Sequence, residues 1–255
     1  MVYNYLTKTI IMLILSIETS CDETALALLE CSGTAKAPKI KVLENLVSSQ
    51  INIHRPFGGV VPNLAKREHE KNLPLLYTQI KNSKHCLPSI ASAKEGQTPD
   101  LIAITVGPGL PPALWVGIGF AKKLGEELNV PVVGANHMEG HIAAILLPTS
   151  DTLKVKNGKK SYRSSLTTVH FPAIALLVSG GHTELVLIKN WLDYTIIGET
   201  VDDAAGEAFD KVARMLDLGY PGGPLISKHA LTGNRYAFSL PRPMLNSKNY
   251  NFSFS

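Results

Sequence analysis

The sequence contains one local pattern twice, and this repeat constrains the fold more than any other feature. In the first copy, apolar runs at residues 12–17 and 25–30 flank the polar segment Glu-Thr-Ser-Cys-Asp-Glu-Thr. About 160 residues later, apolar runs at 173–178 and 185–189 flank Ser-Gly-Gly-His-Thr. Two apolar runs joined by a polar turn are typical of a β-hairpin. The repeat therefore predicts an internal duplication, with one copy in each of two lobes.

Composition places the chain among ordinary globular proteins. It has 255 residues, of which 45% are hydrophobic and 18% are charged. These values exclude a disordered, collagen-like or coiled-coil chain. The net charge of +4 suits transient contact with a polyanion but does not by itself predict nucleic-acid binding. Cys21, Cys31 and Cys86 are far apart, which argues against disulfides and cysteine-based zinc sites and favours a reducing cytosol.

The middle of the chain predicts parallel strand pairing. An apolar run at 100–106 is followed by Gly-Pro-Gly, a helical composition at 113–128 and a second apolar run at 130–135. This order is that of a βαβ unit, and it predicts an α/β fold. A further helix is expected at 63–83, broken or kinked near Pro74, because proline removes a helical hydrogen bond.

These patterns divide the chain into four expected parts. Residues 1–12 form an N-terminal extension, 13–147 the first lobe, 148–170 a connecting excursion rich in Ser, Thr and Lys, and 171–255 a second lobe that is incomplete. The apolar run at 10–17 is much shorter than the ~20 residues of a membrane span. No small-residue cleavage site follows it, so a buried strand is expected rather than a signal peptide, and no membrane association.

Both polar turns carry groups that suit a phosphate ligand. In the first turn, Ser20 supplies a hydroxyl, and Asp22 and Glu23 supply carboxylates that can organise a cation. In the second, Ser179 is followed by two glycines, which let a ligand approach the backbone closely. An ordinary solvated turn is the alternative for the first copy taken alone. One turn from each lobe predicts a nucleotide held by its phosphates in a cleft.

The segment Asn-His-Met-Glu-Gly-His at 136–141 is the sharpest chemical signal. His137 and His141 are four residues apart, so on a helix they project from one face and can bind one metal ion. The zinc-protease motif His-Glu-x-x-His is excluded, because Glu139 lies roughly 200° around the helix from His137. Two unrelated surface histidines are the alternative. A third ligand has to come from elsewhere in the chain.

Acidic residues gather at the start of a helix expected at 201–218, which begins at two aspartates that suit the positive end of its dipole. Asp203, Glu207 and Asp210 fall on one face, a geometry that suits contacts to ribose hydroxyls or a cation. A solvated helix face is the alternative, and the spacing alone slightly favours it.

Several other conspicuous residues receive no functional role from the sequence. Arg67 and His69 fit a solvated helix face, and His54 stands alone. Trp115 fits packing in the core or at an interface.

Seven motifs occur in an order that resembles one known family, the tRNA N6-adenosine threonylcarbamoyltransferases, also called the universal glycoprotease-like family. The resemblance runs from about residue 13 to residue 255. It rests on IETSCDET (17–24), HRPFGGVVPNLAKREH (54–69), GPGL (107–110), HMEGH (137–141), LVSGGHT (177–183), DDAAGEAFDK (202–211) and YPGGP (220–224).

The resemblance implies a fold and a reaction. The fold is the actin-like ATPase fold, an α/β architecture of two duplicated ribonuclease-H-like lobes around a nucleotide cleft. The reaction is transfer of the threonylcarbamoyl group from threonylcarbamoyl-AMP to N6 of adenosine 37, in tRNAs that read codons starting with A, with release of AMP.

The resemblance also assigns site residues. His137 and His141 become ligands of one divalent metal ion, with Fe²⁺ preferred and Zn²⁺ as the alternative. Asp22 and Glu23 become candidate catalytic carboxylates of the cleft. The residues implied to surround the adenylate are Leu177, Val178, Ser179, Gly180, Gly181, Asp210 and Gly223.

Partners follow from the same resemblance. It implies a cytoplasmic enzyme that acts on tRNA with a small inactive paralogue and an ATPase partner, and ATP with Mg²⁺ as a further occupant of the cleft. Two departures are visible: Pro111 and Pro112 stand where small flexible residues are usual, and family members continue past Ser255 into a part that carries a third metal ligand. A non-catalytic scaffold paralogue and a sugar or acetate kinase of the same superfamily are the alternative functions.

Overall fold

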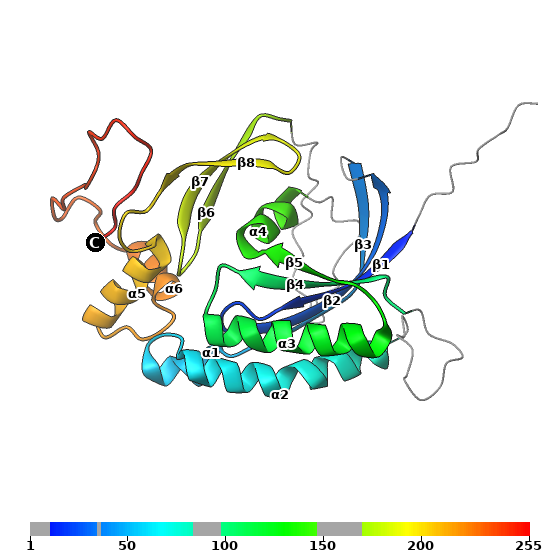
Figure 1. Ribbon diagram of the computed structural model, residues 1–255. Coiled ribbons are helices and arrows are strands. Elements are labelled where there is room, and N and C mark those ends of the chain that lie inside the picture. The colour runs from blue at the N-terminus through cyan, green and yellow to red at the C-terminus, as the bar shows by residue number, and fades with distance from the viewer. Residues whose placement is uncertain (1–10, 35–36, 84–97, 147–169) are drawn as a thin grey trace, which may run out of the picture. The chain divides into compact units, whose positions relative to one another are not determined.

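The protein is described by a computed structural model, and the residues that it describes are 11–34, 37–83, 98–146 and 170–255 (Figure 1). Most of the expected N-terminal extension and of the connecting excursion lies outside these residues. The chain divides into two compact units. Unit 1 comprises Met1–Gln50 and Pro62–Thr167, and unit 2 comprises Ile51–Val61 and Thr168–Ser255.

Unit 1 is built on a five-stranded sheet with the order β3-β2-β1-β4-β5. β1 and β2 form the expected antiparallel hairpin and β3 extends it, whereas β4 pairs parallel with both β1 and β5. This strand order and these directions are those of the ribonuclease-H-like fold. The elements are β1 (Met12–Glu18), β2 (Glu23–Thr34), β3 (Ala37–Ser49), α2 (Pro62–Lys81), β4 (Leu101–Gly107), α3 (Pro111–Leu128), β5 (Val132–Asn136) and α4 (His137–Leu146).

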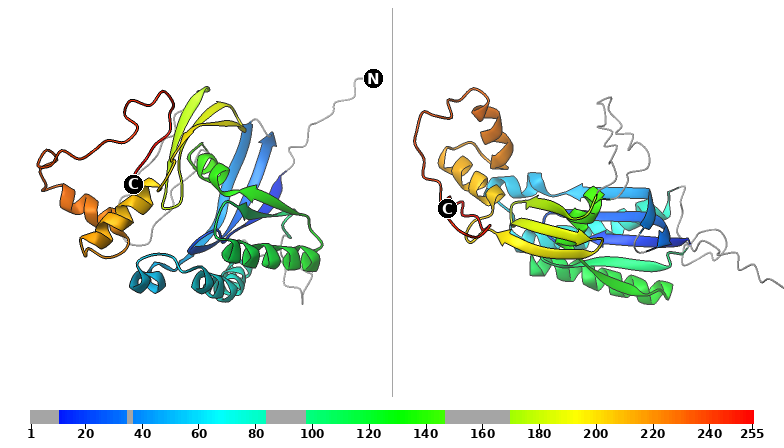
Figure 2. Two further views of the ribbon diagram at one scale, coloured as in Figure 1. Left: turned by 60° about the vertical axis from the view of Figure 1, so that its left-hand side comes forward. Right: turned by 90° about the horizontal axis from the view of Figure 1, so that it is seen from above.

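The core of unit 1 lies between one face of this sheet and the helices α2 and α3, which lie next to each other (Figure 2). Alternate residues of the central strands point into it, as a half-buried strand requires. Leu15 and Ile17 of β1 meet Ile104 of β4 and, from the helices, Leu73 and Leu124. The opposite face of β1 carries Ser16 and Glu18, and Glu18 lies beside His137 of α4. Within the described residues, no helix combines the length and the apolar character that crossing a bilayer requires.

Two expectations for helix α2 are wrong: the break at Pro74 and the solvated position of His69. Helix α2 is not broken at Pro74 but continues to Lys81. Thr78 lies one turn further on, and its Oγ1 donates to the Pro74 carbonyl at 2.8 Å. For Trp115, packing in the core is excluded, since the residue is 67% exposed on α3, and packing at an interface stays a prediction. His69 is not on a solvated face, since it is fully buried.

Unit 2 repeats the first half of unit 1. Its three strands pair antiparallel in the order β6-β7-β8, so each unit contains three consecutive antiparallel strands that begin with a hairpin. Two helices follow and pack against each other (Figure 2). The elements are α1 (Ile51–His54), the 3-10 helix η1 (Arg55–Phe57), β6 (Ala173–Val178), β7 (Thr183–Asn190), β8 (Asp193–Glu199), α5 (Ala205–Met215) and α6 (Gly222–Ala230).

Helix α5 begins later than the sequence predicts, so the two aspartates are not in its first turn. Thr200 Oγ1 donates to the Asp203 carbonyl, and this bond helps to hold residues 200–203 in a turn. The Ala205 N–H then donates to Thr183 Oγ1 at 2.9 Å. The Thr183 hydroxyl thus accepts a hydrogen bond from an N–H of the first helical turn, which has no partner within the helix. This bond fixes the start of α5 next to the hairpin of β6 and β7.

Candidate active site

The turn that follows β1 is held tightly against α3. Thr19 is fully buried, and its Oγ1 donates to the Ala113 carbonyl at 3.1 Å. The Leu110 N–H donates to the Ser20 carbonyl at 2.7 Å. A Cβ at Gly117 would lie 2.3 Å from Thr19 Oγ1, so only glycine fits there. The motifs at 17–24 and 107–110 are therefore parts of one packed structure.

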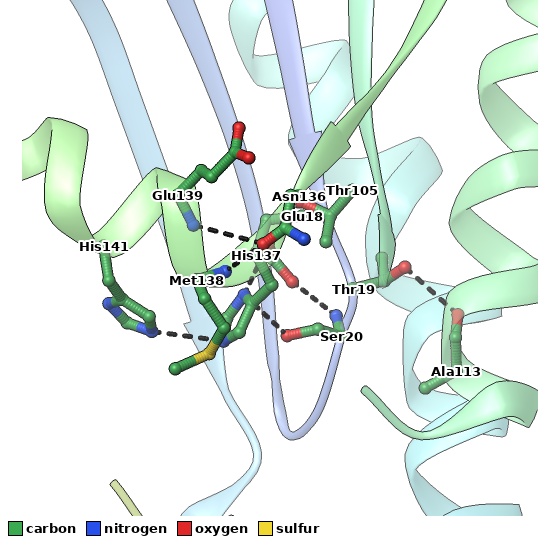
Figure 3. Close-up of polar contacts among 10 residues, drawn as sticks. All are labelled: Glu18, Thr19, Ser20, Thr105, Ala113, Asn136, His137, Met138, Glu139 and His141. Atoms are coloured by element: carbon green, nitrogen blue, oxygen red, sulfur yellow. Dashed lines mark hydrogen bonds and ion pairs between the residues drawn. The ribbon is translucent and has the colours of Figure 1, made fainter. Parts of the chain in front are cut away.

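Helix α4 starts directly after β5 and carries both histidines. Asn136 forms its N-terminal cap, because Oδ1 accepts hydrogen bonds from the N–H groups of Met138 at 2.8 Å and Glu139 at 3.2 Å. The imidazoles of His137 and His141 turn toward each other, with their Nε2 atoms 3.1 Å apart. The Glu139 side chain points away from them (Figure 3), in agreement with the exclusion of the zinc-protease motif.

Glu18, the last residue of β1, completes this cluster and was missed in the sequence. Its Oε2 accepts a hydrogen bond from Thr105 Oγ1 at 2.5 Å and lies 3.3 Å from His137 Nδ1 (Figure 3). Its Oε1 accepts one from the Ser20 N–H at 2.5 Å. Burial alone would raise the pKa of Glu18, but the hydrogen bonds from His137, Ser20 and Thr105 outweigh burial and lower the pKa to about 2. Its signal in the sequence is its place directly after the apolar run at 12–17.

The orientation of His137 suits a metal ligand. A carboxylate only accepts hydrogen bonds, so Nδ1 carries the proton and donates to Glu18, which leaves the lone pair of Nε2 facing His141. Metal-bound histidines are commonly oriented by a carboxylate in this way. Two nitrogens bound at ~2.05 Å to a tetrahedral ion lie about 3.3 Å apart, close to the 3.1 Å found here. The described residues contain no group of three or more His, Cys, Asp or Glu placed to hold a metal, so they fit a two-nitrogen portion of a site.

Asp22 and Glu23 lie at the junction of the turn with β2. Burial raises the pKa of Glu23 to about 7, and the neighbouring Asp22 carboxylate adds to the effect. Ser49 Oγ donates a long hydrogen bond of 3.5 Å to Glu23, and this bond lowers the pKa of Glu23 less than burial and Asp22 raise it. Burial, together with Asp22 and Glu23, also raises the pKa of the Cys21 thiol to about 12. The turn therefore presents a carboxyl group that changes its charge near neutral pH.

The second polar turn is ordered by its own serine. Ser179 Oγ accepts hydrogen bonds from the N–H groups of Gly181 at 3.3 Å and His182 at 2.9 Å. A Cβ at Gly180 or Gly181 would meet nothing within 4 Å, so both glycines are open on one side. The Ser179 carbonyl accepts from the Gly206 N–H at 3.1 Å, which seats the turn on the start of α5. Of the two residues before this turn, Leu177 is buried and Val178 is exposed.

The acidic residues Asp203, Glu207 and Asp210 do not act as one face. Lys211 Nζ pairs with Asp203 at 2.6 Å and with Glu207 at 3.1 Å. Asp210 instead accepts a hydrogen bond from the Gly222 N–H at 2.7 Å and so fixes the start of α6. Gly223, the residue assigned to the adenylate by resemblance, lies in the first turn of that helix.

A comparison with protein-family models decides which family carries these motifs. Residues 41–255 match the family described as tRNA N6-adenosine threonylcarbamoyltransferase. The chain belongs to this family. The match includes the histidine pair of α4 and the serine–glycine turn of unit 2.

Members of the family that match the chain include those of two Thermosipho species. The tRNA N6-adenosine threonylcarbamoyltransferase of Thermosipho africanus is 48% identical over 96% of this chain and 64% of its own length. That of Thermosipho melanesiensis is 49% identical over 96% of this chain and 65% of its own length. The chain thus spans less than two thirds of these relatives. Among solved structures, the PPX-GPPA enzyme of Aquifex aeolicus has 14% identity and a TM-score of 0.36, covering 74% of this chain and 52% of that one.

Proposed function

We propose that this protein transfers a threonylcarbamoyl group from threonylcarbamoyl-AMP to N6 of adenosine 37 in tRNA. The observation that carries the proposal is the pair of Nε2 atoms 3.1 Å apart on α4, with the first imidazole held by Glu18, in a chain of this family. Neither a scaffold nor a kinase needs such a pair. The acceptor class follows from the family description, which names a tRNA adenosine.

His137 and His141 are the residues that would hold a divalent metal, with Fe²⁺ preferred and Zn²⁺ as the alternative. Such an ion supplies Lewis-acid chemistry, which polarises a carbonyl or phosphoryl oxygen. Glu18 keeps the proton of His137 on Nδ1, and its own pKa of about 2 means that it remains a carboxylate at neutral pH. Glu18 is thus proposed to orient the ligand rather than to exchange protons.

Glu23 is proposed to move the proton of the reaction. When adenosine N6 attacks the carbamoyl carbon, a C–N bond forms, the bond to the phosphate oxygen breaks, and N6 loses a proton. AMP leaves with the electron pair of the broken bond. A carboxylate with a pKa of about 7 accepts a proton near neutral pH more effectively than an ordinary glutamate. Asp22, its neighbour, supports this pKa by charge repulsion.

The adenylate contacts remain predictions from the family resemblance. Ser179, Gly180 and Gly181 suit a phosphate, because the two glycines leave space beside the backbone. Asp210 and Gly223 lie around the start of α6. We also propose, on the resemblance alone, a cytoplasmic location, a small inactive paralogue and an ATPase as partners, and ATP with Mg²⁺ as an alternative occupant.

The test is complementation of a bacterial strain depleted of its own threonylcarbamoyltransferase. The gene that encodes this chain should restore N6-threonylcarbamoyladenosine, measured by mass spectrometry of digested tRNA. His137→Ala and His141→Ala should abolish the restoration, whereas Glu139→Ala, on the same helix but facing away, should retain it. Full restoration by either histidine variant at matched protein level would remove the metal-based mechanism, and failure of the unaltered gene would remove the proposed function.

A further inference from the structure

His69 of α2 lies beneath the turn that presents Asp22 and Glu23, and its ring bonds directly to that turn. The side chain is fully buried, as are those of Thr24 and Gln50 beside it. Its Nε2 lies 3.0 Å from the Cys21 carbonyl oxygen. Its Nδ1 lies 2.8 Å from Thr24 Oγ1 and 3.4 Å from Gln50 Nε2.

These partners define the protonation of the ring. A backbone carbonyl only accepts a hydrogen bond, so Nε2 carries the proton and donates to Cys21. An amide nitrogen only donates, so the contact with Gln50 Nε2 makes Nδ1 the acceptor, and the Thr24 hydroxyl donates to it as well. The neutral imidazole therefore satisfies both of its nitrogens, which a buried polar group requires.

The bond from His69 is one of three that fix successive carbonyls of the turn. The Ser20 carbonyl accepts from the Leu110 N–H at 2.7 Å, and the Asp22 carbonyl accepts from the Gln50 N–H at 3.0 Å. Between them, the Cys21 carbonyl is held by His69, the only side chain among the three donors. The conformation of residues 20–22 is therefore set by three donors: Leu110 just before α3, His69 of α2 and Gln50 just after β3.

We infer that His69 is a positioning residue, which holds the Asp22–Glu23 carboxylate pair in its working geometry through the Cys21 carbonyl and Thr24. The inference rests on the proposed function, in which these carboxylates act on the substrate. An apolar side chain would fill the same space without needing partners, and buried polar networks are costly when any member is unsatisfied. An imidazole whose two nitrogens are both hydrogen-bonded fills the core at this position and also fixes the conformation of the turn.

The test compares His69→Gln with His69→Asn in the full chain. The longer amide of glutamine reaches the position of Nε2 and can still donate to Cys21, whereas that of asparagine ends near the position of Nδ1. The first readout is the contribution of Glu23 to the pH dependence of stability. It is measured as the change in Tm between pH 5 and pH 8, each protein being compared with its own Glu23→Gln derivative. No substrate is present, so this readout does not depend on the proposed function.

We expect His69→Asn to lose at least half of the Glu23 contribution, because a loosened turn lets the carboxylates separate and become hydrated. His69→Gln should keep most of it. The groups that face Glu23 and share in this effect are Asp22, Glu18 and Ser49. Where transfer is measured, His69→Asn should lower kcat about 10- to 100-fold with little change in KM, as expected for misplaced catalytic groups. Glu70→Gln, on the exposed side of the same helix, is the control.

A lower Tm in both variants with an unchanged Glu23 contribution would make His69 a core residue only, and would overturn the inference. Should the His69 variants fail to fold, Thr24→Val replaces them, since it removes only the hydroxyl that donates to Nδ1. It should reduce the Glu23 contribution, whereas Thr24→Ser keeps the hydroxyl and should not. An equal effect of both Thr24 variants would contradict the inference in the same way.

Discussion

Two glutamates of one hairpin show how local partners decide the behaviour of a carboxyl group. Burial raises the pKa of both Glu18 and Glu23. Glu18 also accepts hydrogen bonds from His137, Ser20 and Thr105, and these hold its pKa at about 2. Glu23 instead faces another carboxylate, that of Asp22, and its pKa rises to about 7. The first group is suited to permanent charge and the second to proton exchange.

Glu23→Gln should remove a pH-dependent loss of stability. The folded-state pKa of about 7 lies above the ordinary value of 4.5, so the folded state binds the proton more tightly than the unfolded state. This contribution to stability is complete below about pH 4.5 and is lost as the pH rises through 7. The fall in Tm between pH 5 and pH 8 should therefore be smaller in Glu23→Gln than in the unaltered protein.

Thermal unfolding followed by circular dichroism measures this difference. Glu126→Gln, an exposed residue near the end of α3, is the matched control and should follow the unaltered protein at every pH. Equal slopes of Tm against pH for the unaltered protein and Glu23→Gln would contradict the raised pKa. Only the direction of the effect is predicted, because Glu23 is partly solvated and solvent screens its interaction with Asp22.

Residues were predictable from the sequence where spacing alone fixes geometry. The pairing of His137 and His141 follows from the helical period, and their nitrogens do meet. Glu18 and His69 were not predictable in this way, because their partners come from other elements. Thr105 is 87 residues from Glu18, and Cys21 is 48 residues from His69. No local pattern distinguishes His69 from a residue on a solvated helix face.

At the scale of elements, the contact between α5 and α6 explains the first of the two glycines at the start of α6. A Cβ at Gly222 would lie 2.4 Å from the Ala213 Cβ and 2.9 Å from the Phe209 carbonyl oxygen. A Cβ at Gly223 would meet only the Phe209 Cβ, at 4.0 Å, an ordinary contact distance. The first glycine is therefore required for close packing of the two helices, and the second is not.

Gly222→Ala should destabilise unit 2, whereas Gly223→Ala should not. Forcing one methyl group into a packed contact costs typically about 1–3 kcal/mol. The Gly222 N–H also donates to Asp210, so a displaced α6 loses that bond as well. Urea unfolding monitored in both variants measures the difference. If Gly223→Ala were as unstable as Gly222→Ala, the two positions would be equally crowded. That result would contradict the distances found in the structure.

The elements themselves were largely predictable, and their ends were not. Hairpins and the βαβ unit follow from apolar runs and turn residues, and each is present. The start of α5 depends on Thr183, which lies 22 residues away in the hairpin, so it could not be predicted from the local sequence. A break or a kink was expected near Pro74, and α2 runs through this residue without a break.

At the scale of the whole molecule, one segment of the chain belongs to a different unit from the residues on either side of it. Residues Ile51–Val61 interrupt unit 1 in sequence but belong to unit 2. Arg214 Nη2 donates to the Gly58 carbonyl at 2.8 Å, across 156 residues of chain. The segment lies between two elements of unit 1, so nothing local in the sequence indicates its partner. The duplication, in contrast, was predictable because each copy carries its own turn.

Because each unit is compact by itself, a ligand that binds one folded unit should stabilise that unit against unfolding. The histidine pair lies in unit 1, and Zn²⁺ serves as a redox-stable probe of it. A ligand present at 100 times its Kd stabilises the binding state by about 2.7 kcal/mol, which corresponds to a rise in Tm of about 5–10 °C for a body of this size.

We expect Zn²⁺ to raise Tm in the unaltered protein and to leave it unchanged in His137→Ala and His141→Ala. Glu139→Ala should respond like the unaltered protein, because its side chain points away from the imidazoles. Scanning calorimetry with and without the ion provides the measurement, and a chelator should reverse the shift. An equal rise in the histidine variants would place the ion elsewhere, since an ion held by both imidazoles loses half of its nitrogen ligands when either one is removed.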